Sequence, residues 1–320
     1  MKTVCKAICI VLASLILAFA ALPAAYACKT DRDGEAVSWN WNWKCLRKER
    51  AYTPSDERQA ELKKVYNRYN FSLAWGLYDI SGKTLKEVAS YHADEEFQSN
   101  CTIKAAMLLL ICKRMDAGKL SLGTKLKVST GKLHYDDFYW GSGKYTVKFL
   151  LERMIHVSNN SCYEVFLRYV GRENFNEFLK GLGSGTVIRS YNYMGECLTR
   201  DRATEWFALY NYCHSGAKHA DHAWKLLCEA KYSPIRDGIG RPAAHKSGWH
   251  YEDGVYGTAG DCAVVQTENG GCYLMVMFTR NNVRGNYSQK LMRELAVALD
   301  HVWDEYYTSL PKCRRTVAEF

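Results

Sequence analysis

Strand-like segments lie near both ends of this 320-residue chain, and the stretch between them is helical. Near the N-terminal end, residues 71–80 and 84–91 flank the turn residues 81–83. Near the C-terminal end, residues 243–249, 257–266 and 272–279 form three more, and residues 267–271 make a hairpin turn between the last two. Hairpin-linked strands pair antiparallel. The sequence therefore predicts one antiparallel sheet built from both ends of the chain.

Helical segments surround and separate these strands. Ser55 can cap a helix over residues 56–70, and a long amphipathic helix covers 288–310. Between the two groups of strands, helices are expected at 102–115, 147–155, 163–170, 174–182, 199–213 and 221–230, with loops at 120–145 and 183–198. We therefore predict an α/β fold of the α+β type, with flanking helices and an inserted helical lobe. No repeat or linker divides it, so we expect one domain over residues 55–313 and a tail over 314–320.

The first 27 residues have the organisation of a secretory signal peptide. Lys2 and Lys6 precede an apolar run over residues 7–22, and Pro23 and Ala25-Tyr26-Ala27 supply a break and a small-residue cleavage pattern. We expect cleavage after Ala27 and a secreted, extracellular or cell-envelope protein. An uncleaved anchor is the alternative, because the apolar run is barely long enough to span a bilayer. Lipidation of Cys28 is a further alternative, although Ala25 stands where such signals prefer leucine.

Residues 28–54 form a polar N-terminal extension. Trp39, Trp41 and Trp43 alternate with asparagines, which is typical of a strand with one packed face. A surface on which sugars stack is the functional alternative.

Cysteine usage agrees with an oxidising compartment. Of the 13 cysteines, 11 lie after the signal peptide, so at least one has no partner within the chain. Cys28 with Cys45, and Cys262 with Cys272, are the local disulfides we expect first. No cysteine pair has zinc-ligand spacing, and we predict no metal and no cofactor.

The charge of the chain excludes one class of partner. Loss of Lys2 and Lys6 with the signal peptide would change the formal net charge from +9 to +7. The remaining basic residues are scattered and no nucleic-acid motif is present, so we expect no nucleic-acid binding. A modest positive charge favours anionic surfaces such as a cell wall. We expect a monomer that can associate with the wall.

Three short motifs could carry chemistry. Cys101 and Lys104 share one helix face, where the amine and the helix N-terminus would favour a thiolate. A nucleophile beside an amine base is a workable pair for acyl transfer. The other two motifs are Ser158-Asn159-Asn160 and Lys246-Ser247-Gly248. Taken singly, each has an ordinary explanation: a buried or disulfide-bonded cysteine, a helix cap, and a solvated strand lysine.

Taken together and in this order, the motifs resemble those of class A β-lactamases and low-molecular-weight penicillin-binding proteins. That family carries Ser-x-x-Lys, then Ser-Asp-Asn, then Lys-Thr/Ser-Gly. The segment 97–120, the segment 145–160 and Thr199-Arg200-Asp201 extend the resemblance. It covers about residues 55–310 and implies the β-lactamase/transpeptidase-like fold.

The resemblance also implies a role for each motif residue. Cys101 stands where the nucleophile attacks a lactam or peptide carbonyl, Lys104 is the general base, and Ser158 passes a proton to the leaving nitrogen. The remaining residues would bind substrate: Asn160 its amide, Lys246 and Ser247 its carboxylate, and the backbone N–H groups of Cys101 and of Trp249, just after Gly248, the oxyanion.

Three departures from the family pattern bear on activity. Cysteine replaces serine at position 101, and Asn159 replaces the usual aspartate. Residues 183–198 contain no Glu-x-x-Asn, which class A enzymes use for deacylation. Glu196 is the only acid in that segment and comes too late in it. An acyl-enzyme would therefore be expected to persist.

Three functional hypotheses follow. The first is a secreted β-lactamase-related hydrolase that acts on β-lactams or D-Ala-D-Ala-like wall peptides through a covalent intermediate at Cys101. The second is a slowly deacylating penicillin-binding or sensing module. The third is a non-catalytic relative in which Cys101 is structural.

Overall fold

The computed structural model describes residues 52–68, 72–252, 255–268, 271–284 and 287–311. The expected signal peptide, Trp39, Trp41 and Trp43, the Cys28–Cys45 pair and the tail 314–320 lie outside these residues. Within the described residues, no helix combines the length and the apolar character that crossing a bilayer requires.

A five-stranded antiparallel sheet joins the two ends of the chain, as predicted. Its order is β2 (Lys86–Tyr91), β1 (Ser72–Asp79), β9 (Cys272–Arg284), β8 (Val255–Gln266) and β7 (Ala243–Glu252). The N-terminal hairpin thus pairs with the last strand, and β7 is left at one edge. The fold class predicted from the sequence is confirmed.

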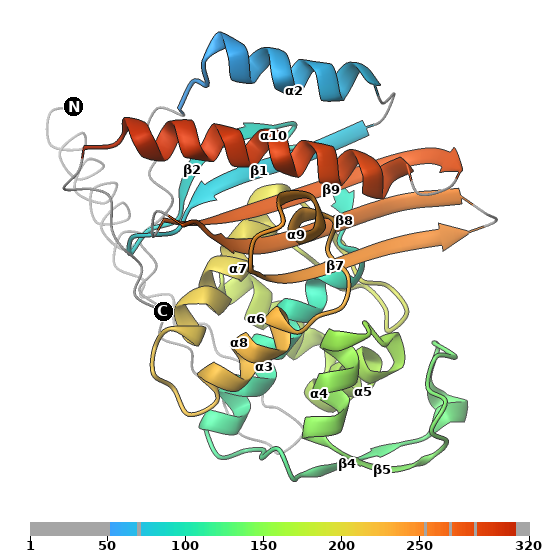
Figure 1. Cartoon of the computed structure of the whole chain (residues 1–320). Helices are drawn as coiled ribbons and strands as arrows, with labels where there is room; N and C mark the ends of the chain where they lie inside the picture. The colour runs from blue at the N-terminus through green and yellow to red at the C-terminus, as the bar shows by residue number, and fades with distance from the viewer. Residues whose placement is uncertain (1–51, 69–71, 253–254, 269–270, 285–286, 312–320) are drawn as a thin grey trace, which may run out of the picture. The chain divides into compact units, whose positions relative to one another are not determined.

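One face of the sheet is covered by helices from both ends of the chain. These are α2 (Asp56–Arg68), the short α9 (Pro234–Ile239) and α10 (Tyr287–Ser309); in Figure 1, α2 and α10 run across the top of the molecule and α9 is drawn below α10. The apolar core here combines Leu62, Leu291, Leu295 and Trp303 with residues of β1, β8 and β9. Burial of such side chains stabilises the fold by about 1.5–3 kcal/mol each. The sequence did not predict α9.

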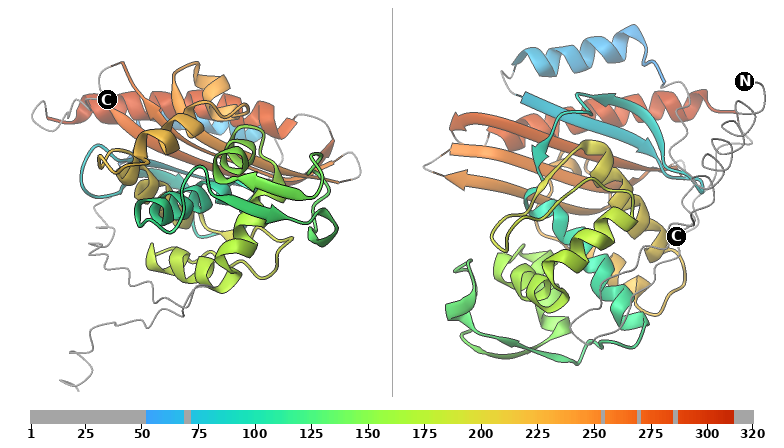
Figure 2. Two further views of the ribbon diagram at one scale, coloured as in Figure 1. Left: turned by 90° about the horizontal axis from the view of Figure 1, so that it is seen from below. Right: turned by 180° about the vertical axis from the view of Figure 1, so that it is seen from behind.

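The inserted helical lobe lies on the other side of the sheet, as both views of Figure 2 show. It consists of α3 (Lys104–Asp116), α4 (Val147–His156), α5 (Asn160–Val170), α6 (Arg172–Gly181), α7 (Thr199–Cys213) and α8 (Ala220–Cys228). Helix α3 contacts each of the other five, and 11 of its 13 residues are buried. Helix α7 contacts β1, β8 and β9 and so joins the lobe to the sheet. The first motif therefore stands at the start of the most enclosed helix of the lobe.

The two segments that were expected to be loops contain short paired strands and buried polar contacts. Residues 120–145 include β4 (Lys125–Val128), which pairs with β5 (Gly143–Thr146), and β3 (Phe97–Gln98) pairs with β6 (Glu196–Cys197). In the segment 183–198, Ser184 and Thr186 are buried and their hydroxyls donate to the Glu205 carboxylate. Strands of two to four residues have too few positions for a recognisable alternation, so tertiary contacts decide them.

The expected Cys262–Cys272 disulfide is wrong. Cys262 lies opposite Val276 and Cys272 lies opposite Gln266, so the two cysteines are separated along the β8–β9 ladder. Both are buried free thiols, and none of the eight cysteines in the described ranges is bonded to another.

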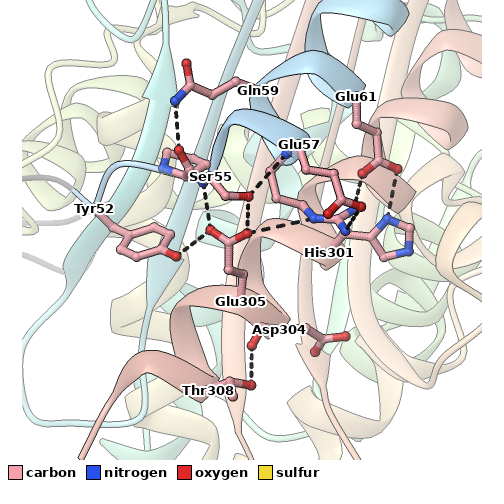
Figure 3. Close-up of polar contacts among 11 residues, drawn as sticks. Tyr52, Ser55, Glu57, Gln59, Glu61, His301, Asp304, Glu305 and Thr308 are labelled. Carbon is pink, nitrogen blue, oxygen red and sulfur yellow. Dashed lines mark hydrogen bonds and ion pairs between the residues drawn. The ribbon is translucent and has the colours of Figure 1, made fainter.

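Hydrogen bonds join the N-terminus of helix α2 to Glu305 of helix α10 (Figure 3). The Glu305 carboxylate accepts hydrogen bonds from Tyr52 Oη at 2.5 Å, Ser55 N at 2.8 Å and Ser55 Oγ at 2.5 Å. Although partial burial alone would raise the pKa of Glu305, these bonds lower it below its usual value. A carboxylate at a helix N-terminus also complements the helix dipole.

We expect Glu305→Gln to lower the free energy of unfolding by about 1 kcal/mol at neutral pH. Because the pKa of Glu305 is lowered by folding, its contribution is complete above the unfolded pKa and is lost as the pH falls below it. Chemical denaturation at pH 7 and pH 3 should therefore show a larger difference in stability between wild type and the variant at pH 7 than at pH 3. An equal difference at both pH values would contradict this account.

Candidate active site

The first motif lies where a short 3-10 helix runs into α3. Cys101 belongs to this 3-10 turn, η1 (Asn100–Ile103), and Lys104 begins α3. Residues three apart in a 3-10 turn lie above one another. Lys104 Nζ consequently lies 3.2 Å from Cys101 Sγ, and the Lys104 side chain is fully buried.

The second motif forms the turn between α4 and α5. Lys104 Nζ donates to the Ser158 carbonyl oxygen at 2.6 Å and to Asn160 Oδ1 at 2.6 Å, and lies 3.4 Å from Ser158 Oγ. Ser158 has φ of 60°, in the left-handed region that few non-glycine residues adopt. Such strain persists only where surrounding contacts fix it. The buried ammonium of Lys104 supplies two of those contacts.

The third motif lies on β7, at the edge of the sheet next to η1. Lys246 Nζ donates to Ser158 Oγ at 2.8 Å and to the Ser247 carbonyl oxygen at 2.7 Å. Gly248 packs directly against Cys101, because a Cβ built there would lie 2.2 Å from Cys101 N. Only glycine allows β7 to approach the Cys101 backbone this closely.

A cavity of about 190 Å³ opens over these residues. Tyr232 and Trp249 form part of its wall, with ring centroids 5.9 Å apart in an edge-to-face arrangement, and the Tyr232 side chain is exposed. Lys231, His156 and Lys246 also line it, whereas no aspartate or glutamate in the described part of the chain does. The cavity is therefore suited to an anionic ligand and offers no carboxylate base.

The charges around Cys101 favour its ionised form. Burial alone would raise the pKa of the thiol, but the positive charges of Lys104 and Lys246, and hydrogen bonds from Ser158 and Lys104, together lower it. Burial lowers the pKa of Lys246 to about 8, although the negative charge of a Cys101 thiolate opposes this shift. The arrangement can hold a thiolate beside two amines, which is a nucleophile next to groups that can carry its proton.

The structure brings the predicted site residues together. Seven of them line the cavity: Cys101, Ser158, Asn160, Lys246, Ser247, Gly248 and Trp249. Lys104 lies beneath it and contacts Cys101, Ser158 and Asn160. The Ser247 hydroxyl donates to the Tyr232 carbonyl oxygen at 2.6 Å, which ties the third motif to the opposite wall residue Tyr232.

Six residues of the described cavity lining were not among the predicted site residues: Ile155, His156, Val157, Ala230, Lys231 and Tyr232. Tyr232 lies in the connection between α8 and α9, and His156 ends α4. Tyr232 belongs to no recognisable motif and only the tertiary fold brings it to the cavity, whereas His156 lies just before the second motif, two positions from Ser158.

Comparison with known proteins finds one matching sequence family and a set of solved structures with the same fold. A sequence model described as the β-lactamase enzyme family matches residues 57–305. No curated protein sequence matches the chain significantly.

Solved structures with the same fold have low sequence identity to this chain. PBP-A superposes with a TM-score of 0.66 at 18% identity, over 80% of this chain and 98% of PBP-A. The TLA-1 extended-spectrum β-lactamase gives a TM-score of 0.68 at 15% identity, over 78% and 99% of the two chains. A class A β-lactamase from Bacteroides cellulosilyticus gives 0.66 at 16% identity, over 79% and 99%.

Replacement of Gly248 tests the close contact between β7 and Cys101. We expect Gly248→Ala to lower the free energy of unfolding by about 1–3 kcal/mol, because the added methyl overlaps the Cys101 backbone. Gly257→Ala on β8 is the matched control, since a Cβ there meets only His250 Cδ2 at 3.8 Å. Equal melting temperatures for the two variants would show that β7 does not pack against Cys101 as described.

Replacement of Lys246 tests the electrostatics. Removal of a positive charge disfavours a nearby thiolate, so we expect Lys246→Met to raise the pH midpoint of Cys101 alkylation by iodoacetamide. The midpoint is measured by intact mass, with Cys101→Ala used to subtract the other thiols. Lys225→Met, on the exposed surface of α8, is the control and should not change the pH midpoint of Cys101 alkylation. A midpoint unmoved by Lys246→Met would mean that Lys246 does not stabilise the thiolate.

Proposed function

The chain belongs to the β-lactamase enzyme family, and from this premise we propose that it is a secreted acyl-transfer hydrolase whose nucleophile is the Cys101 thiolate. Its substrates would be β-lactams or D-Ala-D-Ala-like wall peptides. The observation that carries the proposal is the placement of Lys104 Nζ 3.2 Å from Cys101 Sγ, with Lys246 Nζ 2.8 Å from Ser158 Oγ.

Acylation would proceed by nucleophilic attack at the substrate carbonyl. Cys101 Sγ forms a bond to the carbonyl carbon, and the C–N bond of the lactam or peptide breaks. The leaving nitrogen takes the Ser158 hydroxyl proton, which Lys246 can replace because its Nζ lies 2.8 Å from Ser158 Oγ. Water then cleaves the thioester: its oxygen goes to the released carboxylic acid, and its second proton returns Lys246 to the ammonium form as Cys101 leaves as the thiolate.

Binding groups surround this reaction centre. The Lys246 ammonium would attract the substrate carboxylate, and Asn160 would orient the substrate amide. The backbone N–H groups of Cys101 and Trp249 would receive the oxyanion, since the contact of Gly248 with Cys101 brings the two chain segments together. Tyr232 and Trp249 would pack against the apolar part of the substrate.

A specific observation favours slow turnover, and with it the role of a penicillin-binding or sensing module as the second candidate. The described lining of the cavity contains no carboxylate that could activate a deacylating water. The structure of a PBP-A mutant is described as an acyl-enzyme complex with penicillin G. We propose that the thioester at Cys101 is likewise long-lived, and that the protein acts outside the membrane as a monomer with affinity for the wall.

The proposal is tested by intact mass spectrometry of the reduced protein after incubation with benzylpenicillin. We expect wild type to gain the mass of one penicillin molecule and to lose it slowly. Cys101→Ala should gain nothing, and Cys101→Ser tests whether a hydroxyl can replace the thiol. The same adduct on Cys101→Ala would place the reaction on another residue and overturn the assignment.

The absence of any adduct would have two meanings, which the serine variant separates. An adduct on Cys101→Ser alone would indicate an intact site that lacks a working nucleophile. No adduct on either protein would support the non-catalytic alternative, in which Cys101 packs the start of α3.

A further inference from the structure

Hydrogen bonds join a short segment that precedes β5 to the N-terminal half of α5. We call residues 134–137 the clasp. The buried Glu164 carboxylate accepts the His134 backbone N–H at 2.8 Å, and Ser161 Oγ donates to the Tyr135 carbonyl at 3.1 Å. Both partners lie on α5, so the clasp follows this helix and the turn before it.

Asp137 ends the clasp and caps α5. Its two carboxylate oxygens accept the backbone N–H groups of Asn160, at 2.6 Å, and Ser161, at 2.8 Å. The first N–H groups of a helix have no partner within the helix, and a negative charge there is favourable. Asp137 thus supplies a charge that no residue of the turn 158–160 carries.

The side-chain amide of Asn159 also joins the clasp to the start of α5; we call the contacts of Asp137 and Asn159 with this helix start the junction. Its Oδ1 accepts the Cys162 backbone N–H at 2.8 Å, and its Nδ2 donates to the Asp137 carbonyl at 2.6 Å. An aspartate at 159 could accept the first bond but could not donate the second. It would also bring a second negative charge to the capping carboxylate. Because the Asn159 hydrogen bond goes to the backbone of residue 137, the two side chains are matched in charge: a neutral amide at 159 stands beside the capping carboxylate at 137.

This junction fixes the groups that hold Lys104. Asn160, whose N–H Asp137 accepts, presents Oδ1 to Lys104 Nζ, and Ser158 presents its carbonyl oxygen to the same atom. Ser158 keeps its left-handed backbone only while the turn is held. Lys104 Nζ in turn lies 3.2 Å from Cys101 Sγ.

We propose that Asp137 is a positioning residue for acyl transfer: by capping α5 it holds the turn 158–160 in the conformation that keeps Lys104 and Ser158 at Cys101. The proposal rests on the proposed function only where acylation is the measured quantity. The reactivity of the Cys101 thiol toward an alkylating agent tests it independently.

The experiment compares Asp137→Asn with the matched control Asp136→Asn, which removes an exposed charge from the neighbouring residue. Cys101 alkylation by iodoacetamide is followed against pH, and acylation by benzylpenicillin is followed at pH 7. We expect the alkylation midpoint of Asp137→Asn to move to higher pH and its acylation to be about 10- to 100-fold slower. Asp136→Asn should match wild type in both.

The direction of the shift separates positioning from a plain charge effect. Removal of a negative charge near a thiol lowers the thiol pKa, whereas displacement of Lys104 from Sγ raises it. A midpoint that is unmoved or lowered in folded Asp137→Asn would overturn the proposal. Should that variant be too unstable to purify, Asp137→Glu keeps the charge but displaces it by one methylene, and its midpoint is read in the same way.

The pairing with position 159 gives a second test. We expect Asn159→Asp alone to raise the midpoint and lower the melting temperature, and the double variant Asp137→Asn/Asn159→Asp to be less impaired than the two single changes predict when added. Additive effects would contradict the matched pair. If wild type forms no penicillin adduct, the proposed function fails while both alkylation tests still decide the role of Asp137.

Discussion

Several elements of the fold meet at the buried side-chain nitrogen of Lys104. Lys104 Nζ contacts Cys101 Sγ, the Ser158 carbonyl oxygen and Asn160 Oδ1, and its side chain has no exposed surface. A buried charge costs several kcal/mol unless polar partners surround it. The start of α3 and the turn between α4 and α5 must therefore meet at this atom. The edge strand β7 adds Lys246, whose Nζ donates a hydrogen bond to Ser158 Oγ.

Cysteine at position 101 changes the charge balance of this arrangement. A serine hydroxyl stays neutral at physiological pH, and it would leave two buried amines with no negative charge between them. A thiolate supplies that charge, and the same two lysines lower the pKa of the Cys101 thiol. Since burial brings the pKa of Lys246 to about 8, this lysine can exchange a proton near neutral pH. The site is thus electrostatically consistent with a sulfur nucleophile.

The order of elements and the three motifs could be predicted from the sequence because long apolar periodicities and short fixed spacings are local signals. The sheet from both chain ends and the family membership followed from them. The wall residue Tyr232 and the cap Asp137 could not be predicted, since each acts through a contact that exists only in the folded chain. The Cys262–Cys272 disulfide failed for the converse reason: proximity in sequence across a hairpin does not fix which residues are paired in register.

The central claim is that Cys101 forms a thioester within the site described here. A crystal structure of the reduced protein, frozen after brief exposure to benzylpenicillin, tests it most directly. The account predicts continuous electron density from Cys101 Sγ to the penicilloyl carbonyl carbon, with the carbonyl oxygen within hydrogen-bonding distance of the backbone nitrogens of Cys101 and Trp249. An unmodified Cys101 with the penicilloyl group attached elsewhere in the cavity would contradict it.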